Sequence, residues 1–478
     1  MAGLISGVYD PGVTGMIKIN FEITPQTLVP KLENLFEYAG QKIRLIKKKW
    51  NPEHGAPVFT INGKYTSRGW TEWTQGFQFG CAILQHDATG EKRFLEYGRE
   101  NTFKHMGPHV SHTGVHDHGF NNISTYGNLL RLMLEDQIQE NEMEKSYYEM
   151  ALKISGAVQA ARWTQLPGGL GYIYSFNGPH SLFSDTIRSI RSLAISHQLG
   201  QVLMGEQDSK INLFERGLQH AETTARYNVY FGHGRDAYDL RGRVVHESIF
   251  NIKSGEYRCP STQQGYSPFS TWTRGLAWIL LGYPELLEYI ETLEENEFQG
   301  IANEIYDGKA AVIKRFMEVT EAVADFYLKN TPVDGIPYWD TGAPGLGRLG
   351  NYLDNPADPF NEHEPVDSSA AAIAAQGLIR LGNCLIKLGQ QNKGREYFQA
   401  GLTVANQLFE EPYLSTDSNH QGLILHAVYH RPNGWDYIPP GKKVPCGESC
   451  MWGDFHAMEL GLLLLRMAKG RPYFKFFL

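Results

Sequence analysis

Twelve stretches of the sequence place apolar residues at intervals of three and four, the spacing of a helix with one buried face. Together with caps and Gly or Pro stops, this spacing predicts helices at about 26–48, 73–86, 90–107, 120–137, 142–163, 185–204, 208–231, 271–295, 304–330, 367–388, 392–409 and 454–468. They form consecutive pairs joined by short turns, with longer loops between pairs. Six such hairpins predict an all-α fold, a closed α/α barrel (toroid) whose inner helices line a funnel. The alternative, a superhelical repeat array, would need a fixed sequence period, and none is present.

The long loops are expected to open at one end of the funnel, where a site would form. They carry the segments rich in Gly, Pro and Trp, at 51–72, 108–119, 164–184, 232–270, 331–366 and 410–453. Short strands are expected near 10–22 and 240–258. No break in composition divides the chain, so we predict one domain over residues 1–478, with residues 1–25 as an N-terminal extension.

Charge and cysteine content exclude several classes of partner and fold. The formal net charge of −8 argues against nucleic acid, which requires a basic surface, although a few local arginines would still hold a small anion. Five scattered cysteines do not make a disulfide framework, and we expect free thiols. No run reaches the roughly 18 uninterrupted apolar residues that span a bilayer, and the first residues lack the pattern of a signal peptide. We therefore expect no membrane partner and a cytoplasmic location, or a periplasmic one if a leader has been removed.

Asp185 lies where the Gly-rich loop 166–171 and the segment 180–184 lead into a predicted helix. One interpretation is a helix cap, because the side chain of Ser184 or Asp185 can accept a hydrogen bond from the free amides of the first turn. The other is a functional carboxylate. A second carboxylate, Asp117, precedes the helix predicted near residue 120 in a matching position, and this favours the functional interpretation.

Asp117 belongs to a polar cluster with His109, His112, His116 and His118. Imidazole and carboxylate ligands suit zinc or iron, but this spacing matches no known metal motif, so we expect neither metal nor cofactor. The cluster is then either a polar loop or one side of a site in which Asp117 faces Asp185. Two carboxylates in a water-poor cleft cannot both ionise easily, so one of them would keep a proton near neutral pH and act as a general acid.

The segment 262–278 supplies Trp272, Arg274 and Trp278 near the start of another predicted helix. Such residues usually pack and add a surface charge. At the mouth of a funnel, however, they would stack on a sugar ring and hold a carboxylate through the guanidinium fork.

Three further residues near helix starts have simpler interpretations. Trp73 is a candidate site residue, whereas Trp452 is assigned to the core. Asp367, followed by two serines, is predicted to cap the helix that begins after it.

Taken in order, these segments resemble the unsaturated glucuronyl hydrolases of glycoside hydrolase family 88. The matching segments are Glu72-Trp-Thr-Gln-Gly-Phe77, His116-Asp-His-Gly-Phe120, Asp185, Gln264-Gly265, Ser270-Thr-Trp-Thr-Arg-Gly-Leu-Ala-Trp278, Tyr338-Trp-Asp340, Asp367-Ser-Ser-Ala370 and Trp452-Gly-Asp454. The resemblance covers about residues 70–470. It implies a six-hairpin α/α barrel that forms a single catalytic domain. It also implies a glycosidase that removes a 4,5-unsaturated uronic acid from the non-reducing end of oligosaccharides made by polysaccharide lyases, such as glycosaminoglycan fragments.

The resemblance also implies roles for individual residues. Asp185 corresponds to the catalytic acid and base, which protonates C4 of the enol ether and then takes a proton from the water that attacks C5. Asp117 corresponds to the supporting carboxylate that holds the uronate and raises the pKa of the acid. The residues implied in substrate binding are His116, His246, Gln264, Arg274, Trp73, Trp278 and Phe176, the last of which stands where relatives have tryptophan.

Some positions depart from the family pattern. His118 replaces an aliphatic residue, and the loop 431–443 lacks the serine and lysine pattern with which some relatives bind a sulfated second sugar. Lys442 and Lys443 either take over that contact or face solvent. The alternatives are an unsaturated rhamnogalacturonyl hydrolase acting on pectin fragments, a carbohydrate-binding protein without activity, and an isomerase that uses paired histidines. The expected partner is an unsaturated oligosaccharide, and the chain is expected to be a monomer or a homodimer.

Overall fold

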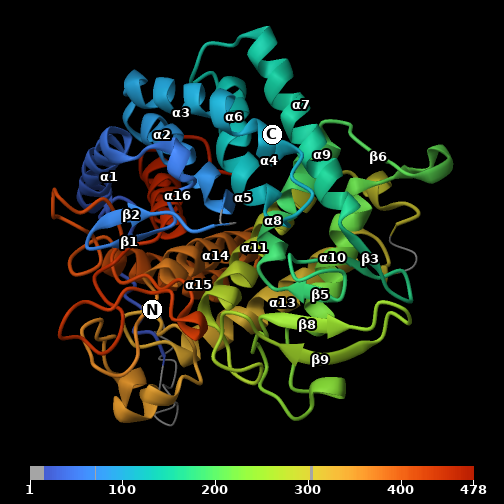
Figure 1. Cartoon of the computed structure of the whole chain (residues 1–478). Helices are drawn as coiled ribbons and strands as arrows, with labels where there is room; N and C mark the ends of the chain where they lie inside the picture. Colours follow the sequence, from blue (N-terminus) through green and yellow to red (C-terminus); the bar gives the residue numbers. More distant parts are fainter. Residues whose placement is uncertain (1–15, 70–71, 302–304, 478) are drawn as a thin grey trace, which may run out of the picture.

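The computed structural model describes residues 16–69, 72–301 and 305–477 (Figure 1). The helices are α1 (Val29–Lys49), α2 (Gln75–Thr89), α3 (Lys92–His105), α4 (Gly107–Val110), α5 (His118–Asn122), α6 (Asn128–Leu134), α7 (Glu142–Ala161), α8 (Thr186–Ser189), α9 (Arg191–Gln198), α10 (Leu213–Tyr227), α11 (Thr273–Thr292), α13 (Lys309–Asn330), α14 (Ser368–Lys387), α15 (Gln391–Leu408) and α16 (Met451–Ala468). The strands are β1 (Phe59–Ile61), β2 (Lys64–Thr66), β3 (Trp163–Gln165), β4 (Gly171–Ile173), β5 (Ser181–Phe183), β6 (Leu203–Met204), β7 (Lys210–Ile211), β8 (Glu247–Phe250) and β9 (Tyr257–Ser261).

The helices form two concentric rings. Along the inner ring α2 contacts α5 and α6, α5 contacts α8, α8 contacts α11, α11 contacts α14, and α14 contacts α16, which returns to α2. The outer helices α1, α3, α7, α10, α13 and α15 each pack against an inner neighbour (Figure 1). The chain therefore has the predicted α/α barrel, and each of the twelve predicted helices has a counterpart in the described residues.

Two predicted helices are interrupted. The helix expected at 120–137 consists of α5, a π-helical turn at Ile123–Gly127, and α6. The helix expected at 185–204 is split into α8 and α9 and ends at Gln198, so that prediction was too long. Residue 304, the predicted start of α13, lies outside the described residues, and α13 begins at Lys309.

Inner helices approach one another closely because glycine stands at the contacts. A Cβ atom on Gly119 would lie 2.2 Å from the carbonyl oxygen of Ser189, and one on Gly76 would lie 2.3 Å from that of Asn121. Real Cβ contacts do not occur at such distances, so these two positions require glycine. They fix α5 against α2 and α8, at the end of the barrel where Asp117 and Asp185 lie.

The strands are short and lie in loops rather than in a central sheet. The expectation near 240–258 is confirmed by β8, which pairs with β5 and β9 in a three-stranded antiparallel sheet. The expectation near 10–22 was wrong for residues 16–22, which form no strand, and its remainder lies outside the described residues. The pairs β1–β2, β3–β4 and β6–β7 were not predicted.

The core is continuous from the first described residues to the last. One apolar cluster includes Ile17, every inner helix and Phe477. Residues 16–25, part of the predicted N-terminal extension, join it: the amide of Ile17 donates to Leu328 O at 3.2 Å. Residues 1–15 lie outside the described part, and the prediction of a single domain over 1–478 stays a prediction. All five cysteines are free, as expected.

Helix α14 is long and apolar enough to cross a bilayer, but 89% of its apolar window is buried inside the protein. It packs between α11, α15 and α16. Its composition is therefore explained by its place in the core.

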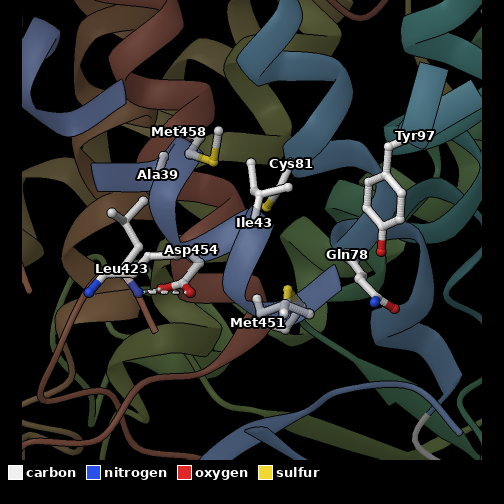
Figure 2. A pocket seen from close by; sticks show the side chains of 11 residues that line it. Ala39, Ile43, Gln78, Cys81, Tyr97, Leu423, Met451, Asp454 and Met458 are labelled. Carbon is white, nitrogen blue, oxygen red and sulfur yellow. Dashed lines mark hydrogen bonds between the residues drawn. The ribbon is translucent and has the colours of Figure 1, made fainter. Parts of the chain in front are cut away.

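A small cavity lies between α1, α2 and α3 on one side and α16 on the other (Figure 2). Its lining is mostly apolar, and its acidic group, Asp454, is fully engaged. The carboxylate accepts hydrogen bonds from Tyr65 Oη at 2.6 Å, Ser449 Oγ at 2.7 Å, and the amides of Leu423 and Ile424 at 2.9 Å. Asp454 thus ties β2 and the loop 410–449 to the start of α16.

Replacing Asp454 by asparagine is expected to lower the free energy of unfolding by about 2–4 kcal/mol, because the amide nitrogen faces donors and the charge-assisted bonds are lost. Urea or thermal denaturation measures the effect. The same change at exposed Asp208 should stay within about 0.5 kcal/mol. Equal stability of the two variants would show that the carboxylate is not the anchor.

Candidate active site

The long loops open at one end of the barrel around a cavity. Its lining combines aromatic, polar and acidic side chains from loops that are far apart in the sequence. They are Trp73, Val115, His116, Asp117, Phe120, Phe176, Asp185, Gln263, Gln264, Trp272, Arg274, Trp278, Tyr429, His430, Asn433 and Trp435. Eight of the nine predicted site residues lie in this lining, and the ninth, His246, contacts it from behind.

Two carboxylates meet one imidazole at the inner end of this cavity. The Nε2 atom of His116 lies 3.4 Å from Asp185 Oδ1 and 3.7 Å from Asp117 Oδ1. These are charge contacts, since neither ring nitrogen of His116 has a hydrogen-bond partner among the described residues. All three side chains are buried. The expected approach of Asp117 and Asp185 is therefore present, with His116 between them.

Both carboxylates lie at the residue just before a short helix. Asp185 precedes the four-residue helix α8, and its carbonyl accepts from the amide of Arg188 at 3.1 Å. Asp185 makes no side-chain capping bond, so the interpretation as a helix cap was wrong. The guanidinium of Arg188 binds Glu285 on α11 and Glu459 on α16, which fixes α8 against the inner ring.

The loop before α5 is fixed in a similar way. The carbonyl of Asp117 accepts from the amides of Phe120 at 2.9 Å and Asn121 at 3.2 Å. The carbonyl of His116 accepts from Ser189 Oγ at 2.6 Å, which links this loop to the end of α8. The two carboxylates are therefore positioned by one contact surface between α5 and α8.

The surroundings shift the three groups in different directions. Burial and the charge of Asp185 raise the pKa of Asp117, although the positive charge of His116 opposes them. Burial also disfavours the charged form of Asp185, but the nearby His116, with His246 and Arg274, outweighs it and lowers the pKa of Asp185. The charges of Asp117 and Asp185 overcome burial and raise the pKa of His116.

These directions correct one expectation. The resemblance implied that Asp117 raises the pKa of Asp185, whereas in the unliganded protein the pKa of Asp185 is lowered and that of Asp117 is raised, so Asp185 is the more readily ionised of the two. The reason is that the imidazolium lies closer to Asp185 than to Asp117.

His246 presents a fixed hydrogen-bond donor. Its Nδ1 accepts from the amides of Gln263 at 3.0 Å and Gln264 at 3.3 Å. Burial lowers its pKa to about 4, so the ring is neutral and its proton is on Nε2. That Nε2 is buried and has no hydrogen-bond partner among the described residues.

Arg274 is held rigidly at the cavity wall. It binds Asp367 at 2.7 Å, Gln264 Oε1 at 2.9 Å and the carbonyl of Tyr429 at 2.8 Å. Its guanidinium also lies over Trp272. Asp367 accepts the amide of Ser369 at 3.1 Å, as predicted for the cap of α14, and the same carboxylate orients Arg274.

Aromatic side chains form the rest of the wall. Trp73 stacks on Trp452 with ring centroids 5.1 Å apart, and Trp452 is fully buried, as predicted. Trp278 packs on Phe120 at 4.9 Å. On the side of the acidic residues, Phe176 is 44% exposed and stacks on His116.

Two relatives that match most of the sequence share a name. The unsaturated glucuronyl hydrolase of Formosa agariphila is 24% identical over 391 residues, which is 81% of this chain and 78% of that protein. The unsaturated glucuronyl hydrolase of Bacillus sp. strain GL1 is 25% identical over 413 residues, 86% of this chain and 89% of that protein. No family model matches the chain.

Solved structures show the same fold. The crystal structure of an unsaturated glucuronyl hydrolase specific for heparin covers 92% of this chain and 98% of its own, with a TM-score of 0.69 at 19% identity. The resemblance to the unsaturated glucuronyl hydrolases is confirmed. A hydrolase is the class of enzyme that these comparisons support.

One wall of the cavity was not predicted from the resemblance to unsaturated glucuronyl hydrolases. Tyr429, His430, Asn433 and Trp435 reach it from the loop before α16. Tyr429 and Trp435 pack at 5.3 Å, and Arg68 lies over the indole of Trp435. The aromatic residues of the loop 410–453 were the available signal, but nothing in the sequence indicates that the loop folds back over the funnel.

His109 and His118, on either side of Asp117 in the sequence, serve the fold. His118 contacts Ser155 Oγ at 3.0 Å and the carbonyl of His112 at 2.9 Å, while Nδ1 of His109 contacts Asn121. Among the described residues, no three His, Cys, Asp or Glu side chains are grouped so that they could hold a metal ion. Lys443 pairs with Glu362 in an exposed contact.

Proposed function

We propose that this chain removes a 4,5-unsaturated uronic acid from the non-reducing end of lyase-produced oligosaccharides by adding water to the enol-ether double bond. One observation carries the proposal: two buried carboxylates share one imidazole at the inner end of an aromatic cavity. The names of the relatives support the substrate class.

The polar groups of the cavity suit a uronate. The Nε2–H of His246 is a donor for a carboxylate, and Arg274, whose terminal N–H groups are engaged within the protein, adds positive charge beside Gln264. Trp73 and Trp278 offer flat faces to a sugar ring, and Phe176 takes the place of a wider indole. The second sugar would lie toward His430, Asn433 and Trp435.

The reaction needs one group that first gives a proton and then takes one. Asp185 gives a proton to C4, and the positive charge that forms is shared between C5 and the ring oxygen. Water attacks C5 and returns a proton to Asp185. The resulting hemiketal opens, C1 releases the second sugar, and a keto-uronate remains.

The proton on Asp185 comes from its neighbour. In the unliganded protein the lowered pKa of Asp185 favours its ionised form, and the raised pKa of His116 favours its protonated form. A bound uronate adds negative charge and excludes water, and both effects raise the pKa of Asp185. The proton then passes from His116 across the 3.4 Å contact to Asp185. Asp117 keeps its own proton and donates a hydrogen bond to the substrate.

The test is turnover of lyase-made disaccharides from chondroitin, heparin, gellan and ulvan. Hydration removes the conjugated double bond, so the ultraviolet absorbance of the substrate should disappear as free second sugar accumulates. A matched saturated disaccharide is the control and should remain intact. Binding of every unsaturated substrate without loss of absorbance would indicate a carbohydrate-binding protein instead. Turnover of pectin-derived substrate alone would indicate a rhamnogalacturonyl hydrolase.

A further inference from the structure

Helix α7 carries an unpartnered apolar stripe on the outside of the barrel. Met143 is 83% exposed and Met150 is 56% exposed, and Tyr147 and Ile154 are also exposed. Their spacing of four, three and four residues places all four side chains on one face of the helix. Phe103 of α3 extends the stripe, since it is exposed and stacks on Tyr147 at 5.0 Å. Soluble proteins rarely expose contiguous apolar groups of this kind without a partner.

The charges beside the stripe are arranged for a second copy of the same helix. Glu142 and Lys153 are eleven residues apart, about three turns and about 16 Å, so they lie on the same edge of the stripe at its two ends. Neither side chain forms an ion pair within the described part of the chain. Met143 and Ile154 have the same separation.

We propose that α7 pairs with the α7 of a second copy, antiparallel and about a two-fold axis that crosses the stripe between Tyr147 and Met150. A two-fold axis brings residue i of one copy to residue j of the other and the reverse. It therefore places Glu142 beside Lys153 of the other chain, and Met143 beside Ile154, at both ends of the contact. A parallel pairing would instead put like charges together.

The acidic surroundings argue against a membrane as the occupant of the stripe. At its N-terminal half Glu140 and Glu144 are paired with Lys145 and Arg99, Glu142 is left without an ion pair among the described residues, and the chain carries a net charge of −8. An anionic bilayer would repel this face. The stripe is one helix wide, so the dimer belongs to the weak, concentration-dependent class.

Sedimentation velocity of the full chain over roughly 1–200 µM should show a shift from one-chain to two-chain mass. Met150→Glu, which places a charge at the centre of the contact, should weaken association about 100-fold or more. Met204→Glu changes an equally exposed methionine on β6, outside the stripe, and should leave association unchanged.

The charge pair gives a second test that does not depend on the apolar stripe. Glu142→Lys or Lys153→Glu alone should weaken the dimer about tenfold, and the double exchange should restore it. A wild-type chain that stays at one-chain mass throughout would overturn the proposal, as would a dimer unaffected by Met150→Glu. Dependence on phosphatidylglycerol vesicles rather than on protein concentration would assign the stripe to a membrane.

Discussion

Replacing Asp185 by asparagine should lower kcat about 10³-fold or more, because the same carboxyl serves as acid in one step and as base in the next. Asparagine has nearly the same size and keeps the position before α8, but it can neither give nor accept the proton. Loss of ultraviolet absorbance of the preferred disaccharide measures the rate.

This test is specific because the variant should keep substrate binding and lose turnover. Since Arg274, His246 and the aromatic wall remain, the variant should still bind the unsaturated disaccharide in calorimetry, and its unfolding temperature should stay close to that of the wild type. Asp208→Asn, in the exposed turn before β7, is the control for the chemistry of the substitution and should turn over normally. A fully active Asp185→Asn enzyme would remove Asp185 from the mechanism.

Most of the fold was predicted from the helical spacing of apolar residues. Long outer helices such as α1 and α13 were predicted within a few residues, because one face of each packs on the barrel and the other meets water. The interrupted segments were not predicted. Between α5 and α6, and between α8 and α9, both faces are buried, so the apolar pattern gives no sign of where the hydrogen-bond ladder breaks.

From the residues alone, the site was predicted at positions beside helix starts, whereas the loop residues Phe176, His246 and Gln264 came from the resemblance. Asp117, Asp185 and Arg274 occupy such positions, which a sequence reveals through the helix that follows. Trp435 and His430 belong to a loop whose path is set by tertiary contacts, for example by the carboxylate of Asp436, which accepts the amide of His430 at 3.0 Å. No local pattern encodes that path.

The protonation of the pair also required three-dimensional information. The sequence indicates that two carboxylates and a histidine lie close together, but not which carboxylate the imidazole approaches. That distance, 3.4 Å against 3.7 Å, together with the charge of Arg274, favours Asp185 as the group that is ionised before substrate binds.

Replacing His116 by glutamine should lower kcat/KM about 10–100-fold at neutral pH, because the proton store of Asp185 is lost. The pH profile should change as well. In the wild type the raised pKa of His116 sets the basic limb: activity is present below this pKa and falls as pH rises through it. Without the imidazolium, only carboxyl groups store the proton, so the basic limb should move to lower pH by at least ~1 unit.

Replacing His430, the other histidine of the lining, by glutamine distinguishes the effect of proton storage from the effect of substrate contact. Burial and the charge of Arg274 lower the pKa of His430 to about 4, so this ring is neutral throughout the working range. His430→Gln should therefore change KM through the second sugar while both limbs of the profile stay in place. If His116→Gln kept the wild-type basic limb, the proton that reaches C4 would have to come from Asp117, whose raised pKa would then set that limb. A profile that moved equally in both variants would show that neither imidazole stores the proton, and that the limb reflects substrate binding.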